Sequence, residues 1–156
     1  LAALGHARIA LISGGDNRIA RERRAGYEGA MADHGLDPLV VDGAFTERGG
    51  YAGAEAAVDA GATALVVAND LAAIGALAAL RARGLRVPDD VSVVGYDGMR
   101  LFDSLDLTTV AQPLADMGRV AADLLMERIE TPDKPSTHRL VETRLVPRGS
   151  SGPAPA

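Results

Sequence analysis

The sequence contains no cysteine, and aromatic residues make up only 3% of it. The absence of cysteine excludes disulfide bonds and thiolate metal ligands. The sequence also lacks any run of about 18 apolar residues that could cross a membrane, and its first residues do not resemble a secretion leader. We therefore predict no membrane partner and a cytoplasmic location.

The sequence also lacks a concentrated positive charge. It has 21 acidic and 16 basic residues, for a net charge of -5, and the basic residues are scattered over predicted helices. This pattern does not favour binding of a phosphate backbone by this chain alone. The three histidines, His6, His34 and His138, are too far apart in sequence to suggest a metal site. The glycine-rich nucleotide-binding spacings and the nucleophile elbow of hydrolases are also absent, so we predict no cofactor and no enzymatic activity.

The chain does contain a regular alternation of short β-branched runs and helical segments. Strands are predicted over residues 8–13, 38–42, 64–68 and 91–96, and helices over residues 19–34, 51–60 and 71–83. Gly35, Gly61 and Gly84 fall where these helices should end. The pattern predicts an α/β fold, with a doubly wound, mostly parallel sheet covered by helices on both faces. A length of 156 residues fits one such lobe.

Two of the predicted strands are followed at once by polar side chains. Asp97 follows the strand at 91–96, and Asn69 and Asp70 follow the strand at 64–68. In an open α/β sheet, the carboxyl ends of the strands face the binding crevice, so these positions suit ligand contacts. We predict that Asp97 and Asn69 bind a ligand and that Asp70 caps the helix after it. Capping of the turn at Gly98 is the alternative role for Asp97.

Six segments, taken in order, resemble the LacI/GalR family of transcriptional regulators. They read LGHARIALISGG, ARERRAGYEGAMADHGL, ALVVANDLAAIGAL, GLRVPDDVSVVGYDG, LTTVAQPLADMGRVAADLL and RLVETRLVPRGS. The resemblance covers nearly the whole chain. It implies the C-terminal part of the effector-binding core of that family, which is half of a type I periplasmic-binding-protein-like fold.

The resemblance also implies roles for two further residues. Arg23 stands where the family places an arginine that reaches sugar hydroxyls or a ligand carboxylate, although it could instead only solvate a helix face, as we expect of Arg21 and Arg24. Gln112 matches a position where the chain crosses between two subdomains, so its side chain reaches either the ligand or only the hinge. The predicted ligand-binding residues are therefore Arg23, Asn69, Asp97 and Gln112, with no catalytic residue and no metal ligand.

The family resemblance also implies a homodimer. The family dimerises through the helix that matches Leu71 to Arg83 and the segment that matches Met99 to Leu105. The helix is apolar nearly all round, which agrees with burial on more than one face. The alternative is a monomer whose small apolar side chains tolerate exposure.

The sequence predicts that the chain divides into four parts. Residues 1–113 form the effector-binding C-terminal subdomain, and residues 114–130 form an amphipathic helix that in the family packs on an N-terminal subdomain not seen in this sequence. Residues 131–148 are a linker and a returning edge strand, which we expect over 138–146. Residues 149–156 are predicted to be disordered; residues 145–150 also match the thrombin recognition sequence of expression tags.

The predicted helix at 114–130 has an apolar face that should be costly to leave in water. We expect this helix to dock either on its own lobe or on the same helix of a second copy. The predicted function is the effector-sensing and dimerisation portion of a LacI-type regulator, which binds a sugar or a related small polar metabolite. Operator DNA would be bound only by a helix-turn-helix domain that this sequence does not include. A fragment of a periplasmic sugar-binding protein is the alternative.

Overall fold

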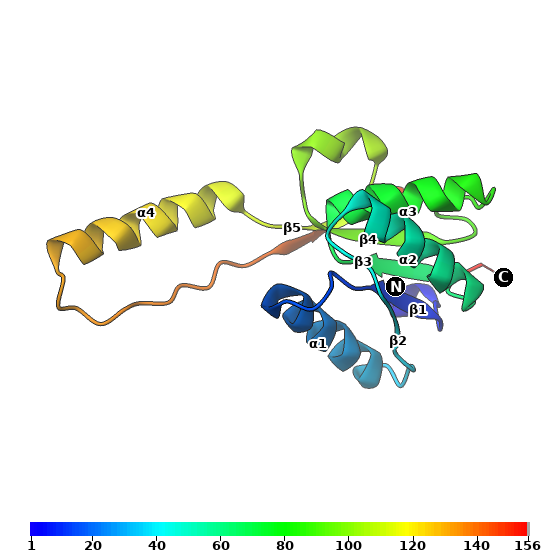
Figure 1. Ribbon diagram of the computed structural model, residues 1–156, viewed down its shortest axis with the longest axis horizontal. Helices are drawn as coiled ribbons and strands as arrows, with labels where there is room; N and C mark the ends of the chain where they lie inside the picture. The colour runs from blue at the N-terminus through cyan, green and yellow to red at the C-terminus, as the bar shows by residue number, and fades with distance from the viewer. Residues whose placement is uncertain (156) are drawn as a thin grey trace.

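A six-stranded β-sheet forms the centre of the structure (Figure 1). The computed structural model describes residues 1–155, without the side chains of residues 101–103. Across the sheet, the strands are β2 (Leu39–Val41), β1 (Ile9–Ile12), β3 (Ala64–Val67), β4 (Ser92–Asp97), β5 (Thr108–Ala111) and β6 (Arg144–Val146). The first five are parallel and β6 is antiparallel to β5, which confirms the predicted mostly parallel α/β sheet.

Helices cover both faces of this sheet, as predicted. The helices are α1 (Arg18–Asp33), α2 (Glu47–Asp59), α3 (Asp70–Ala82) and α4 (Leu114–Glu130), with short 3-10 helices η1 (Ala2–Leu4) and η2 (Arg100–Leu105). Figure 1 shows α1 on one face and α2 and α3 on the other. Alternate residues of β1 serve the two faces, because Ile9 and Leu11 join the cluster under α1 whereas Ala10 and Ile12 join the cluster under α2 and α3.

The helices α2 and α3 cross so closely that no side chain fits between them at two points. A Cβ atom on Gly50 would lie 1.8 Å from the carbonyl oxygen of Ala72, and one on Gly75 would lie 1.8 Å from that of Glu47. The prediction that this helix begins at residue 51 was wrong, because α2 starts at Glu47 under an N-cap by Thr46. Gly49 and Gly50 both belong to the helix, and Gly50 permits the close crossing.

The segment after Gly149 is part of the packed lobe, so the predicted disordered tail was wrong. Ser150 is only 4% exposed. Its backbone oxygen accepts from the Val93 N–H at 2.7 Å, and its hydroxyl donates to the Val93 carbonyl at 2.6 Å and accepts from the Thr108 N–H at 2.8 Å. The segment therefore fills the gap between β4 and β5, whose pairing begins only at Val94 and Thr108. Buried polar backbone groups need such partners.

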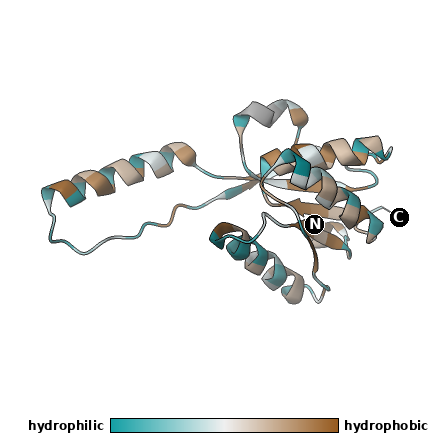
Figure 2. Cartoon of the chain, in the orientation of Figure 1, coloured by the Kyte–Doolittle hydropathy of each residue, from teal (hydrophilic) through white to brown (hydrophobic). Residues whose placement is uncertain are grey.

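The helix α4 and the segment that follows it project away from the lobe as an arm (Figure 1). We define this arm as residues 114–143. Each residue of α4 is at least partly exposed, and Figure 2 shows hydrophobic residues along the helix. The expectation that α4 docks on its own lobe was therefore wrong. The returning strand is also shorter than expected, because only Arg144–Val146 of the predicted stretch pairs with β5.

Within residues 1–155, no helix is long and apolar enough to cross a membrane. The same described residues contain no group of three or more histidine, aspartate or glutamate side chains that could hold a metal ion.

Candidate functional site

The carboxyl ends of the parallel strands bring together three of the four predicted ligand-binding residues. Asp97 ends β4, Gln112 directly follows β5, and Arg23 reaches the same point from α1. The Gln112 side-chain amide donates to Asp97 Oδ1 at 2.8 Å, and a guanidinium nitrogen of Arg23 lies 3.5 Å from the same oxygen. These three side chains are partly exposed, so one carboxylate and two sets of hydrogen-bond donors face solvent at a single edge.

Two aromatic rings surround the guanidinium of Arg23. Its carbon lies 3.8 Å from the ring centre of Tyr96 and 5.4 Å from that of Phe45, distances at which a cation interacts with an aromatic face. A further hydrogen bond from Arg23 to the carbonyl oxygen of Ala68 holds the guanidinium over the end of β3. Arg23 therefore does not merely solvate the helix face, which was the alternative role considered for it.

Sequence reasoning missed Phe45 and Tyr96. Tyr96 directly precedes Asp97 at the end of a strand, and this position next to a predicted ligand-binding residue was a usable signal. Phe45 lies in the loop between β2 and α2, and nothing in its local pattern indicates the site. The structure brings it there because Gly14 leaves room: a Cβ atom on Gly14 would lie 2.3 Å from the Phe45 ring.

The backbone at Asp97 is held in an unusual conformation. Its φ angle is 125°, a value that residues with a Cβ atom rarely adopt, and Gly98 follows with a φ of 71°. Burial raises the pKa of the Asp97 carboxyl above its ordinary value, and the nearby Arg23 charge and the Gln112 hydrogen bond offset part of this rise. The negative charge of Asp70 adds to the rise. Asp97 is thus a partly desolvated carboxylate, which binds hydrogen-bond donors strongly.

The roles predicted for Asn69 and Asp70 are partly reversed in the structure. Asn69 is the N-cap of α3, because its Oδ1 accepts from the Ala72 N–H at 2.9 Å. The prediction that Asp70 caps this helix was therefore wrong. Asp70 is the first residue of α3, and its carboxylate is buried. Asn69 is still partly exposed at the same edge, so its side-chain NH₂ group is available for a ligand contact.

A hollow of about 480 Å³ lies beside this edge, next to α1. It is lined by Ser13, Gly15, Asp16, Ala20, Arg21, Arg24, Ala25, Glu28, Asp42 and Gly43. Arg21 pairs with Asp16 and Arg24 pairs with Glu28, both at 2.7 Å, as expected for arginines that solvate a helix face. The four predicted ligand-binding residues lie outside this hollow. The candidate site is therefore an open edge, as expected for one wall of a cleft.

Comparison with known proteins identifies the fold. The model of the periplasmic binding protein-like domain matches residues 1–151. The HTH-type transcriptional regulator MalR of Streptomyces coelicolor is 38% identical over 165 residues, which cover 99% of this chain and 48% of MalR. The chain thus spans about half the length of the curated relatives it matches.

Two solved structures with bound sugars are similar to this chain. A LacI family transcriptional regulator from Enterococcus faecium with bound ribose has a TM-score of 0.91 at 30% identity, over 98% of this chain and 59% of that one. The transcriptional regulator CelR in complex with cellobiose has a TM-score of 0.90 at 38% identity, over 97% of this chain and 49% of that one.

The parallel sheet with polar side chains at its carboxyl edge is thus the ligand-binding lobe of a periplasmic binding protein-like fold. The chain belongs to the LacI/GalR family of transcriptional regulators and corresponds to the C-terminal part of their effector-binding core. These relatives are transcriptional regulators.

Proposed function

We propose that this chain is the effector-sensing part of a transcriptional regulator and binds a sugar, or a related small polar metabolite, at the strand-end edge. The proposal rests on one observation: Arg23 and Gln112 both direct hydrogen-bond donors at the Asp97 carboxylate, beside the rings of Tyr96 and Phe45. Sugar hydroxyls both donate and accept hydrogen bonds, so they can pair with the carboxylate and with the guanidinium and amide groups. Aromatic rings beside such polar groups are typical of small-molecule sites.

The ligand class is supported by the two similar regulators whose structures contain ribose and cellobiose. In this proposal, Arg23, Asn69, Asp97 and Gln112 contact the sugar, and Phe45 and Tyr96 present their rings to it. Because the chain covers about half of its relatives, the opposite wall of the cleft would come from a part of the protein outside these residues. We therefore expect weak binding by this chain alone.

The binding test is an NMR titration of the 156-residue chain with ribose and, separately, with cellobiose. Both the backbone amides and the side-chain amides of Asn69 and Gln112 report on the edge. We expect shifts that concentrate at these residues for at least one sugar and that disappear in Asp97→Ala. Asp116→Ala, which removes an exposed carboxylate on α4, is the matched control and should keep the shifts. Shifts spread over the surface, or none at all with either sugar, would refute sugar binding at this edge.

We further propose that ligand binding is relayed to DNA by a change in the relative orientation of two lobes. A ligand that contacts both walls of a cleft favours the closed arrangement, and such a two-state shift can reposition attached domains. The relatives are described as helix-turn-helix regulators, so the DNA-binding domain would lie outside this chain. Operator binding is accordingly proposed for the complete protein only.

We propose that the chain forms a homodimer through α3 and the segment 99–105. Leu71 on α3 is 39% exposed, and Met99 and Leu105 of the segment are 38% and 42% exposed. Exposed hydrophobic side chains of this size favour association. Sedimentation equilibrium should give a dimer that Leu71→Glu dissociates and Leu125→Glu, on the arm, leaves intact. The opposite result would place the interface on α4.

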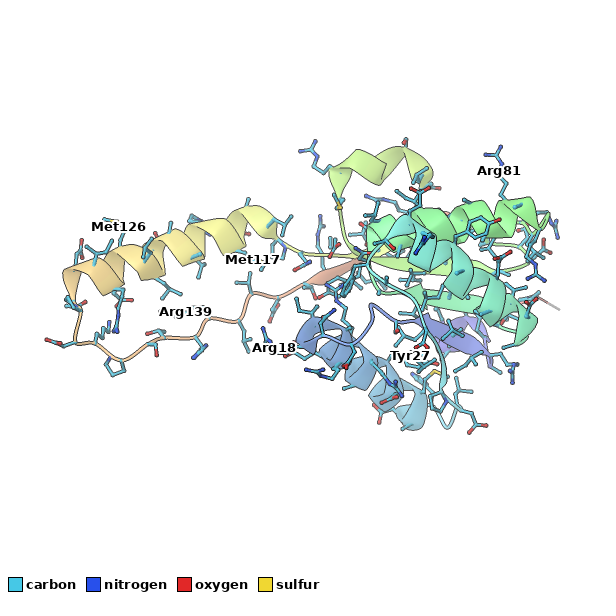
Figure 3. All side chains as sticks on the ribbon, viewed as in Figure 1. Arg18, Tyr27, Arg81, Met117, Met126 and Arg139 are labelled. Atoms are coloured by element: carbon cyan, nitrogen blue, oxygen red, sulfur yellow. The ribbon has the colours of Figure 1, made fainter. Side chains whose placement is uncertain are left out.

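For the arm, we propose that the apolar side chains of α4 pack on a subdomain outside this chain. These exposed side chains are Leu114, Met117, Leu125, Met126 and Ile129, and Figure 3 shows Met117 and Met126 on the projecting helix. Their burial would contribute about 1.5–3 kcal/mol for each side chain that becomes fully covered. Addition of the preceding part of the protein should therefore reduce hydrogen exchange in α4, and unchanged exchange would contradict this proposal.

A further inference from the structure

Asp70 is a buried carboxylate close to the site, where its charge contributes to the raised pKa of Asp97. Only 1% of its surface is exposed, and it does not cap α3. Burial of a charged carboxylate is costly unless hydrogen bonds compensate for lost water. The partners of Asp70 should therefore reveal what its burial achieves.

The carboxylate of Asp70 connects three separate elements. As the first residue of α3, it lies near the positive end of the helix dipole. Its Oδ1 accepts from the Thr109 hydroxyl of β5 at 2.6 Å, and its Oδ2 accepts from the Met99 N–H at 2.9 Å. Asp70 thus holds the chain just two residues after Asp97.

The turn that Asp70 holds is strained. Asp97 and Gly98 both have positive φ angles, of 125° and 71°. Gln112 fixes one end of the turn, since its N–H donates to the Asp97 carbonyl at 3.0 Å and its side-chain amide donates to the Asp97 carboxylate at 2.8 Å. Asp70 fixes the other end through Met99. Strained conformations persist only where the surroundings hold them on several sides.

The neighbouring strand leaves room for the Asp70 carboxylate. A Cβ atom on Gly95 of β4 would lie 2.4 Å from Asp70 Oδ1. Any other residue at this position would displace the carboxylate from Thr109 and Met99. The absence of a side chain at Gly95 therefore allows the Asp70 carboxylate to reach both of its hydrogen-bond donors.

We propose that Asp70 is a positioning residue for effector binding: its buried carboxylate holds the turn at Met99 and so fixes the direction in which Asp97 presents its own carboxylate to the ligand. This inference rests on the proposed sugar site, and it adds to that site a residue that does not touch the ligand itself. The hydrogen bonds do the positioning, and the charge of Asp70 is not required for it. Asparagine can keep both hydrogen bonds, because its amide oxygen accepts from Met99 and its NH₂ group can donate to a rotated Thr109 hydroxyl.

Three variants of the 156-residue chain separate positioning from stability. Asp70→Ala removes both hydrogen bonds, Asp70→Asn keeps their geometry, and Leu80→Ala destabilises the same helix from a residue far along α3. NMR of each free protein gives the Met99 amide shift and the side-chain NH₂ shifts of Gln112. Titration with ribose and cellobiose then gives the affinity of each variant.

In the free protein, Asp70→Ala should move the Met99 and Gln112 signals, whereas Asp70→Asn should move the Gln112 signals little and Leu80→Ala should leave both in place. For a sugar that binds the unmodified chain, affinity should fall about tenfold or more in Asp70→Ala and stay within about threefold in the other two.

Unmoved Gln112 signals in Asp70→Ala would overturn the inference without reference to any ligand. An equal loss of affinity in Leu80→Ala would also overturn it, because the effect would then follow stability. If neither sugar binds the unmodified chain, the proposed function fails, and the free-protein spectra alone decide the role of Asp70.

Discussion

The lobe and the arm differ in what their apolar side chains contact. In the lobe, Leu65 and Leu80 are completely buried, whereas on the arm Leu125 is 61% exposed and Leu140 is fully exposed. The arm helix α4 nevertheless has an amphipathic sequence, as α2 in the lobe does. The comparison shows that periodicity predicts a helix but not its packing partner, because α4 has no buried residue and does not pack on this lobe.

The largest expected difference between the two regions is in the free energy of unfolding of a matched pair of leucine variants. Leu80→Ala removes a fully buried side chain and should lower the free energy of unfolding by about 2–5 kcal/mol, because it leaves a cavity. Leu125→Ala on the arm should change it by about 0.5 kcal/mol or less, since this side chain already contacts water. Urea unfolding followed by circular dichroism measures both. Equal losses would mean that α4 packs on the lobe in solution.

Close helix crossing provides the second test. In Gly75→Ala, the new Cβ atom would overlap the Glu47 carbonyl, so α2 and α3 must separate. We expect a loss of about 1–3 kcal/mol in the free energy of unfolding. Gly26→Ala on α1 is the control, since no atom lies within 4 Å of its new Cβ. This control should gain about 0.5–1 kcal/mol from helix propensity, and a comparable loss in both variants would refute the packing argument.

A third test compares two serines near the C-terminus, one in each region. Ser150→Ala removes a hydroxyl that bonds Val93 and Thr108, and leaves a buried N–H without its acceptor. This change should lower the free energy of unfolding by about 1–3 kcal/mol, as measured by thermal unfolding. Ser136→Ala, in the exposed linker of the arm, should have no measurable effect. A silent Ser150→Ala would restore the view that this segment is disordered.

The smallest expected effect is an opposite pH response of two carboxyl groups. Burial raises the pKa of Asp97 in the lobe, whereas a hydrogen bond from Lys134 lowers the pKa of Glu127 on the arm. The native protein therefore binds the Asp97 proton more tightly than the unfolded chain does, so this group makes stability fall as pH rises from the ordinary aspartate pKa to the raised one. Stability from Glu127 is present above the ordinary glutamate pKa and is lost as pH falls through the lowered one.

Carbon-13 NMR of the two side-chain carboxyl groups checks these directions. The Asp97 signal should titrate above the ordinary aspartate range and the Glu127 signal below the ordinary glutamate range. The substitution Arg23→Gln should raise the Asp97 pKa further, because it removes the neighbouring positive charge. An Asp97 pKa below the ordinary range would show that the Arg23 charge outweighs burial.

The sequence was sufficient to predict the sheet and most of the candidate site. A strand such as Val91 to Val94 is recognisable from its β-branched residues, and polar residues follow it directly in the sequence. This pattern is why Asp97 and Asn69 could be placed at one edge. The resemblance to the LacI/GalR family supplied Arg23 and Gln112, which periodicity alone does not single out. The family itself is confirmed by the comparisons.

The errors have a shared physical origin in long-range contacts. Asn69 and Asp70 are both good helix caps, and their order was decided by Met99 and Thr109, which lie far along the chain. Residues after Gly149 look like a flexible tail because they are small and polar, yet those same properties let Ser150 fit between two strands. Local patterns carry no information about such distant partners.

The insertion of Ser150 between β4 and β5 has a consequence for synthesis of the protein on the ribosome. Residues near both ends of the chain meet at this point, because the His6 ring also bonds the Gly152 carbonyl at 3.0 Å. The gap between Val93 and Thr108 cannot be filled until residue 150 has been translated, so the nascent lobe must first fold with this seam between the two strands open.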